Sequence, residues 1–289
     1  MKYNMLVVIV LSAFLFTCDR NENVLEPSNN VQVQVGCWSP SYVGYANSQI
    51  GCGLLQSFGD ANLDQQFNGE VGIQRSFWQG VNASVFIFDE CGDKNALSFP
   101  QGYILVGINL FFDVIYSTGS TLPNATVLAH EWVHQVQFRY GWMNNNEPTV
   151  RRTELEADAF SGYYTLLIKS WAIEQFNTVF ATLYNLGDYN YNNRGHHCTP
   201  QERVNAGYLG MNTAIFALQN GISYSYLDLH QIFGNQLAKK EGESTSTQLQ
   251  YQDVIDYLEK IGDRIDEEGF HKVENLRGQD NFIASTIKE

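Results

Sequence analysis

The sequence predicts an α+β domain in which a small N-terminal β-sheet precedes a bundle of helices. Between residues 71 and 112, short runs rich in β-branched and aromatic residues are broken by Gly, Asn and Asp, as is typical of strands and turns. After residue 123 the apolar residues recur at helical spacing. Because strands come first and helices follow, the pattern favours an α+β arrangement over a doubly wound parallel sheet.

The predicted strands lie in three β-type runs, at residues 71–77, 83–89 and 102–112. Within residues 95–112 we expect a strand, a turn at residues 100–102 and a second strand. An exposed strand edge here would accept an extended peptide as an additional strand, whereas the alternative is a hairpin that serves only the core.

The predicted helices cover residues 125–140, 153–171, 203–219, 225–239 and 247–261. Residues 185–203 are polar and rich in Asn, so we expect them to form a loop. Loops on a rigid scaffold often carry functional residues.

The N-terminus has the layout of an exported protein. Residues 1–17 combine a lysine with a short apolar stretch, as in a signal peptide, and residues 15–18 (Leu-Phe-Thr-Cys) resemble the lipobox of bacterial lipoproteins. We therefore expect a signal peptide at 1–17, a lipid anchor on Cys18 with a polar tether to residue 35, and a folded domain at 36–289. This predicts a lipid-anchored protein of the bacterial cell envelope, at the outer membrane or cell surface; secretion without lipid is the alternative.

Charge and cysteine content narrow the functional classes. Lys and Arg total 17 against 31 Asp and Glu, giving a net charge of −14, which disfavours a nucleic-acid partner. Beyond Cys18, four cysteines remain in an exported chain, so disulfides are expected. The preferred pairing is Cys37 with Cys52 and Cys91 with Cys198, and the other pairings stay open.

The sequence at residues 127–137, VLAHEWVHQVQ, predicts a metal-binding helix. His130 and His134 are four residues apart, so both imidazoles lie on one helix face and can bind one Zn²⁺ ion. Glu131 points about 100° further round the helix, beside the ion, where a general base for an attacking water would act. The alternative is a buried helix whose His and Glu side chains satisfy one another, although three polar groups in an apolar helix are costly without a function.

A second motif supplies the third ligand. In TELEADAFSGYY, residues 153–164, Glu154 and Asp158 share a helix face. We expect Glu154 to bind the metal and Asp158 to accept a hydrogen bond from a ligand histidine. Glu156 competes with Glu154 as the ligand, but with Thr153 it also matches a capping box that would place it at the helix N-terminus. His230 and His271 belong to neither motif and are expected not to affect metal binding.

Three segments together resemble the family of neutral zinc metallopeptidases, which are gluzincin-like. These are HEWVHQVQ at 130–137, ELEADAFSGYY at 154–164 and HHCTPQERVNAGYLG at 196–210, against a family pattern of H-E-x-G-H-x-x-Q, E-L-x-A-D-x-x-A-G and an H-G-T-x-x-Q-R-like element. The resemblance covers roughly residues 125–215. Val133, Ser161 and Cys198 depart from the family's Gly, Ala and Gly, without removing a ligand.

The resemblance implies a zincin-like fold and a zinc-dependent peptidase, an endopeptidase rather than an exopeptidase, acting on peptides or proteins. In it His130, His134 and Glu154 are the zinc ligands, Glu131 is the general base and Asp158 orients a ligand. By analogy with related peptidases, His197 would stabilise the oxyanion of the reaction; the alternative is a surface histidine without a role. The competing function is a non-catalytic zinc-binding envelope lipoprotein that acts as a binding or assembly factor, for which Glu131 would be superfluous.

Overall fold

The computed structural model describes residues 53–92, 94–143, 149–169, 175–189 and 197–237. The predicted signal peptide, the tether with Cys18, and the helix at 247–261 lie outside these residues. Within them the fold is mixed α+β and mostly helical, with one four-stranded sheet and seven helices. The predicted class is therefore confirmed. No helix in the described ranges is long and apolar enough to span a membrane.

The sheet is small and mixed. Its strands are β1 (Gly53–Leu55), β2 (Ser84–Asp89), β3 (Ala96–Phe99) and β4 (Tyr103–Gly107), in the order β1-β2-β4-β3. β2 and β4 are parallel, and the two outer strands pair antiparallel to them. The predicted strand, turn and strand at 95–112 is confirmed up to residue 107, and β3 forms an edge of the sheet.

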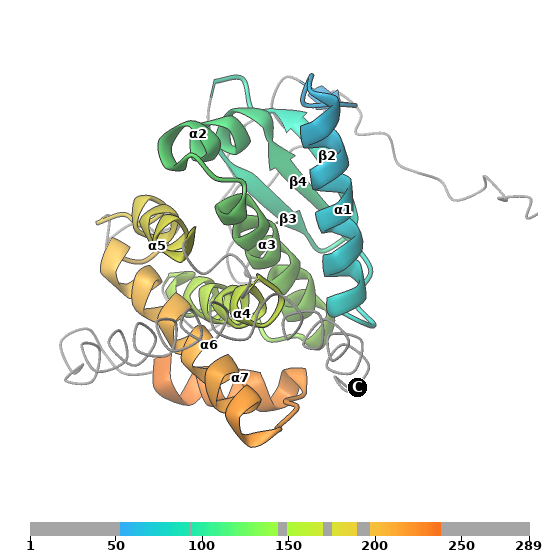
Figure 1. The fold of residues 1–289 in the computed structure, drawn as a ribbon. Coiled ribbons are helices and arrows are strands. Elements are labelled where there is room, and N and C mark those ends of the chain that lie inside the picture. The colour runs from blue at the N-terminus through green and yellow to red at the C-terminus, as the bar shows by residue number, and fades with distance from the viewer. Residues whose placement is uncertain (1–52, 93, 144–148, 170–174, 190–196, 238–289) are drawn as a thin grey trace, which may run out of the picture. The chain divides into compact units, whose positions relative to one another are not determined.

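Helix α3 connects the sheet to the rest of the helices. The helices are α1 (Ala61–Phe77), α2 (Ile108–Thr118), α3 (Leu122–Tyr140), α4 (Arg151–Lys169), α5 (Phe176–Asn185), α6 (Pro200–Asn220) and α7 (Tyr226–Leu237). Figure 1 shows α3 between the sheet and the group formed by α4, α5, α6 and α7. The predicted helices at 125–140, 153–171, 203–219 and 225–239 correspond to α3, α4, α6 and α7, while α5 was not predicted.

Two of the predicted strand segments are helical. Residues 71–77 belong to α1, whose buried side chains Phe67, Val71, Gln74 and Phe77 recur at helical spacing after the N-cap Asp60. Residues 108–112 form the start of α2, and Gly107 provides no side-chain cap there. Instead, the buried carboxylate of Glu90 accepts hydrogen bonds from the backbone N–H groups of Asn109 (2.8 Å) and Leu110 (2.9 Å). Such a tertiary cap cannot be recognised from the local sequence.

Two buried tryptophans join α3 and α4 to the segment that follows α1. The fully buried ring of Trp78, directly after α1, stacks on Tyr164 of α4 with 5.9 Å between ring centroids. Trp132 of α3 is also fully buried, and its indole N–H donates to the carbonyl oxygen of Val81. Aromatic rings of this size dominate core energetics. The histidines of α3 and the acidic residues of α4 are therefore held by the same core.

Helices α4 and α6 approach each other through glycines. A Cβ atom at Gly162 would lie 2.2 Å from the backbone oxygen of Gly207, and one at Gly210 would lie 1.7 Å from that of Ala159. Side chains at these positions would force the helices apart. The close approach brings the start of α6, and with it Arg203, against α4.

The predicted pairing of Cys91 with Cys198 is wrong. Cys91 is disulfide-bonded, but Cys198 is a free, fully buried thiol. Its Sγ atom donates to the carbonyl oxygen of Arg151, and its φ of 75° lies in the left-handed region. That conformation favours glycine, which is the residue the family pattern has at this position. Cys37 and Cys52 lie outside the described residues.

Cys198 is expected to resist alkylation in the folded protein. Burial raises the pKa of its thiol well above the ordinary value, so the reactive thiolate does not form near neutral pH. Iodoacetamide labelling followed by mass spectrometry should leave the Cys198 peptide unlabelled in native protein and label it fully in urea. Rapid labelling of native protein would show that the thiol is accessible.

Candidate metal centre

The polar residues of helix α3 are buried in the core together with its apolar residues. Every residue from Leu122 to Gln137 is buried, and Gly141 ends the helix in the left-handed conformation. Gln135 joins α3 to the sheet, because its amide N–H donates to Ser98 Oγ (2.6 Å) and to the carbonyl oxygen of Phe99 (2.8 Å). Ser98 Oγ in turn donates to the backbone oxygen of Glu131. Edge strand β3 thus lies beside the motif.

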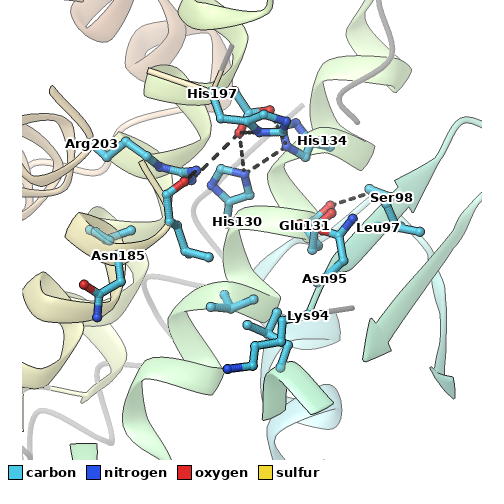
Figure 2. A pocket seen from close by; sticks show the side chains of 16 residues that line it. Lys94, Asn95, Leu97, Ser98, His130, Glu131, His134, Asn185, His197 and Arg203 are labelled. Atoms are coloured by element: carbon cyan, nitrogen blue, oxygen red, sulfur yellow. Dashed lines mark hydrogen bonds and ion pairs between the residues drawn. The ribbon is translucent and has the colours of Figure 1, made fainter. Parts of the chain in front are cut away.

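The structure brings His130, His134 and Glu154 together. The two Nε2 atoms are 3.0 Å apart, and the Glu154 carboxylate lies 3.3 Å from Nε2 of His130 and 3.6 Å from Nε2 of His134. All three residues are buried, and one potential ligand atom from each lies within 4.8 Å of the others. Figure 2 shows the side chains of His130 and His134 next to each other. This group could hold a metal ion.

The hydrogen bonds on the far side of each ring favour metal-binding tautomers. Nδ1 of His130 lies 2.8 Å from Oδ1 of Asp158, and Nδ1 of His134 lies 2.7 Å from Oε1 of Gln137. Both partners are acceptors, so each Nδ1 carries a proton, and in the neutral rings each Nε2 presents a lone pair. Asp158 therefore occupies the place expected for a residue that orients a ligand.

The donor set fits a cation. Among the described residues, Oε1 of Glu154 is a buried carboxylate oxygen without a hydrogen-bond partner. It converges with two ring nitrogens whose lone pairs would repel one another at 3.0 Å. A buried anion and two facing lone pairs are costly unless a positive charge lies between them. Two imidazoles and one carboxylate suit zinc with a fourth position open.

The pKa shifts of the three side chains also indicate that the group favours a bound positive charge. Burial disfavours a charged His130, but the carboxylates of Asp158 and Glu154 outweigh it and raise the pKa of this histidine. Burial and the neighbouring charge of His130 lower the pKa of His134. Burial opposes ionisation of Glu154, yet the pKa of this carboxyl lies well below its usual value because His197 and His130 are adjacent. Without a metal, one proton on His130 would serve as the cation that the group requires.

Glu131 lines the same cavity as the histidines (Figure 2) but is not part of the three-residue group. It is buried, and burial raises the pKa of its carboxyl to about 7, with Glu154 adding to the shift and His130 opposing it. A carboxylate whose pKa lies near the working pH suits general acid–base chemistry.

No protein-family model matches this chain. No significant match was found among curated proteins or solved structures either. The resemblance to zinc metallopeptidases therefore rests on the motif residues themselves. The group formed by His130, His134 and Glu154 is compatible with it.

Glu156 does not cap α4, contrary to the capping-box interpretation. The helix begins at Arg151, so Thr153 and Glu156 both lie inside it. The Glu156 carboxylate is buried and contacts Gln137 and His230, and it is not part of the three-residue group. The structure thus places Glu154, and not Glu156, against the histidines.

His197 lies directly beside the three-residue group. Its Nδ1 atom is 3.2 Å from Oε2 of Glu154, and its side chain retains 34% of its exposure. Its backbone N–H donates to Asp188. Burial alone would lower the pKa of His197, but the Glu154 carboxylate raises it above the ordinary value. A partly exposed imidazole that lines the cavity can face a bound molecule.

Arg203 was not assigned a role from the sequence, although it ends the H-G-T-x-x-Q-R-like element. It lies in the first turn of α6, after the capping box formed by Thr199 and Glu202. Its guanidinium donates to both oxygens of Asp158, at 2.8 Å each, and lies 3.8 Å from Glu154. Arg203 therefore fixes the carboxylate that orients His130.

Arg203→Met is expected to lower the free energy of unfolding by about 3–5 kcal/mol, because Asp158 would keep a buried charge without its main partner. Urea denaturation measures the change. Arg203→Lys keeps the charge but loses the two-point contact, so its free energy of unfolding should lie between those of the wild type and Arg203→Met. A loss below about 1 kcal/mol for Arg203→Met would show that the pair is not needed to hold Asp158.

The cavity beside the group has a volume of about 340 Å³. It is lined by the metal-binding group, Glu131 and His197, and Figure 2 also shows Lys94 and Asn185. Aliphatic side chains from β3, α2, α3 and the end of α5 also line the cavity: Ala96, Leu97, Leu110, Val127, Leu183 and Leu186.

Proposed function

We propose that this chain is a zincin-like, zinc-dependent metallopeptidase that hydrolyses peptide bonds in the bacterial envelope or outside the cell. The observation that supports it most is the buried group of His130, His134 and Glu154 with Glu131 beside it. A purely structural metal site needs ligands but no adjacent base. The buried carboxyl of Glu131, which lines the same cavity as the three ligands, is therefore better explained by catalysis than by metal storage.

Zinc is the proposed metal because two imidazoles and one carboxylate form a typical three-residue catalytic set for it. When bound, zinc would polarise a carbonyl group and lower the pKa of water toward about 7. In our proposal Glu131 takes the proton from the attacking water and later delivers it to the leaving amine. His197, beside Glu154 and partly exposed, would donate to the oxygen that becomes negatively charged.

The proposed substrate is a peptide bound in an extended conformation along β3. This strand is the edge of the sheet, is joined to α3 through Gln135, and lines the cavity with Ala96, Leu97 and Ser98. Main-chain hydrogen bonds to such an edge continue on both sides of the scissile bond and need no chain terminus. This favours an endopeptidase.

The aliphatic side chains that line the cavity favour a bulky apolar side chain next to the scissile bond. Burying such a side chain contributes about 1.5–3 kcal/mol to binding. Lys94, which also lines the cavity, is paired with Asp113.

We further propose that the protein acts in the bacterial cell envelope, where a lipid on Cys18 anchors it. Its partners there would be peptides or envelope proteins. The supporting features are the apolar stretch before residue 18 and the lipobox-like residues 15–18. Replacing Cys18 with serine would release an anchored protein from membranes and would leave a secreted one unaffected.

Digestion of a peptide library by zinc-loaded protein, with products identified by mass spectrometry, tests this function. We expect internal cleavage beside aliphatic or aromatic residues, loss of cleavage with a chelator, and recovery on adding zinc. Zinc-loaded protein that cleaves no peptide would instead favour the binding-factor function. Release of single terminal residues would overturn the assignment as an endopeptidase.

A further inference from the structure

We propose that His230 on α7 and Glu156 on α4 act through Gln137 as positioning residues that hold His134 in its metal-binding tautomer. The inference rests on the metal centre of the proposed function, but not on peptide hydrolysis. It connects a partly exposed side chain on α7 to a buried ligand through two intermediate residues, neither of which is a ligand.

The chain of contacts is continuous. Nδ1 of His134 lies 2.7 Å from Oε1 of Gln137, whose amide nitrogen donates to Oε2 of Glu156 at 3.0 Å. The other oxygen of Glu156 contacts Nδ1 of His230. Gln137 is fully buried, and Glu156 retains only 4% of its exposure. Neither side chain can readily exchange these partners for water.

The orientation of the Gln137 amide determines the tautomer of His134. The two N–H groups of this amide face two acceptors, the carbonyl oxygen of Thr153 and the carboxylate of Glu156, each at 3.0 Å. Its oxygen must therefore face His134, whose Nδ1 must carry the proton. That leaves Nε2 with a lone pair directed at the metal position.

Rotation of the same amide by 180° would have the opposite effect. Its N–H group would then donate to Nδ1 of His134, and the ring proton would move to Nε2, where it blocks a metal. With Glu156 present, this rotation would also place the amide oxygen against two acceptors. Glu156 thus supplies one of the two contacts that exclude the blocking arrangement.

His230 fixes Glu156 from the other side. Its ring stacks on Trp142 with 4.1 Å between centroids and an interplanar angle of 10°, so its orientation is set by the chain that follows α3. Its N–H satisfies the second oxygen of a buried carboxylate, which would otherwise rotate or recruit Gln137 differently. Helix α7 is thereby joined to the metal centre, although His230 retains 25% of its side-chain exposure.

The test combines metal affinity with a direct measurement of the tautomer. We expect Glu156→Met and His230→Phe to weaken zinc binding by about 10-fold in chelator competition, the lower end of the range for loss of a residue bonded to a ligand, because both act through Gln137. For His230 this replaces the expectation from the sequence that it does not affect metal binding. His230→Phe keeps the stack on Trp142 and removes only the donor. His230→Gln, which restores an N–H donor, should recover part of the affinity.

The tautomer is measured by ¹⁵N NMR of histidine-labelled, metal-free protein, with His134 assigned from the spectrum of His134→Ala. Wild-type protein should carry the His134 proton on Nδ1, whereas Glu156→Met should show a population protonated on Nε2. A change in stability alone would not move this proton.

Glu70→Met is the matched control. Glu70 is a glutamate of α1 whose carboxylate contacts Lys169 and Tyr164, so its loss affects packing without touching the proposed contacts. Wild-type affinity and an Nδ1 proton in both Glu156→Met and His230→Phe would overturn the inference. Equal weakening by Glu70→Met would also overturn it. Wild-type protein that binds no zinc would instead remove the metal centre itself.

Discussion

Replacing His130 or His134 with alanine is expected to abolish retention of zinc during dialysis. Loss of a residue that merely orients a ligand typically costs about 10–100-fold in affinity, so loss of a ligand should cost more than about 100-fold. The two side chains that remain in each variant cannot hold the ion against dialysis, because a zinc site of this kind uses three protein ligands. Metal content measured by plasma mass spectrometry, with circular dichroism to verify folding, checks this expectation.

Asp60→Asn is the control for this experiment. It removes an exposed carboxylate from the N-cap of α1, where asparagine caps equally well, and should leave zinc content at one equivalent per chain. Folded His130→Ala protein that retains one equivalent would place the metal elsewhere in the chain.

Glu131→Gln is expected to lower peptide hydrolysis by at least about 10²-fold while leaving zinc binding intact, because a positioned general base typically contributes about 10²–10⁴-fold. Glutamine keeps the size of the side chain and loses the basic carboxylate. Glu131 lies outside the three-residue group, so the ligands are unaffected. Initial rates on a peptide identified from the library, at equal zinc content, measure the effect.

Glu131→Asp distinguishes the need for a negative charge from the need for a side chain of the right length. It retains the carboxylate but withdraws it by one methylene, so partial activity is expected if the base acts over a short distance. Hydrolysis at the wild-type rate by Glu131→Gln would assign the proton transfer to another group.

The parts of the site that could be predicted are those set by the periodicity of a single helix. His130 and His134 share a face because they are four residues apart, and α3 is buried along that face. The same reasoning identified Glu154 and Asp158 as a pair on α4. That these residues of α4 contact the histidines of α3 was predicted because a metal ion bound by two histidines needs a third ligand. In the structure His130 contacts both Glu154 and Asp158.

The parts that could not be predicted depend on contacts between distant segments. Arg203 reaches Asp158 only because glycines allow α4 and α6 to pack closely, and that approach is a property of the pair of helices. Glu156 matched a local capping pattern, but α4 begins two residues before Thr153, and tertiary contacts decide its role. His230 belongs to no motif and is linked to the site only through the position of α7.

The same distinction holds for the fold. The α+β order was visible because strand and helix periods differ, and β2 and β4 lie within runs whose β-branched and aromatic residues predict strands. The start of α2 was predicted as strand because its cap, Glu90, lies well before it in the sequence and is supplied across a turn. Apolar residues 108–112 fit either state until that cap is known.

Titration of metal-free protein with zinc, while peptide hydrolysis is recorded, tests the central claim most directly. If His130, His134 and Glu154 form one catalytic zinc site, hydrolysis should start from zero, rise in proportion to added zinc and saturate at one equivalent per chain. Protein that binds one equivalent at these residues yet hydrolyses nothing, or that hydrolyses peptides fully before any zinc is added, would contradict the account.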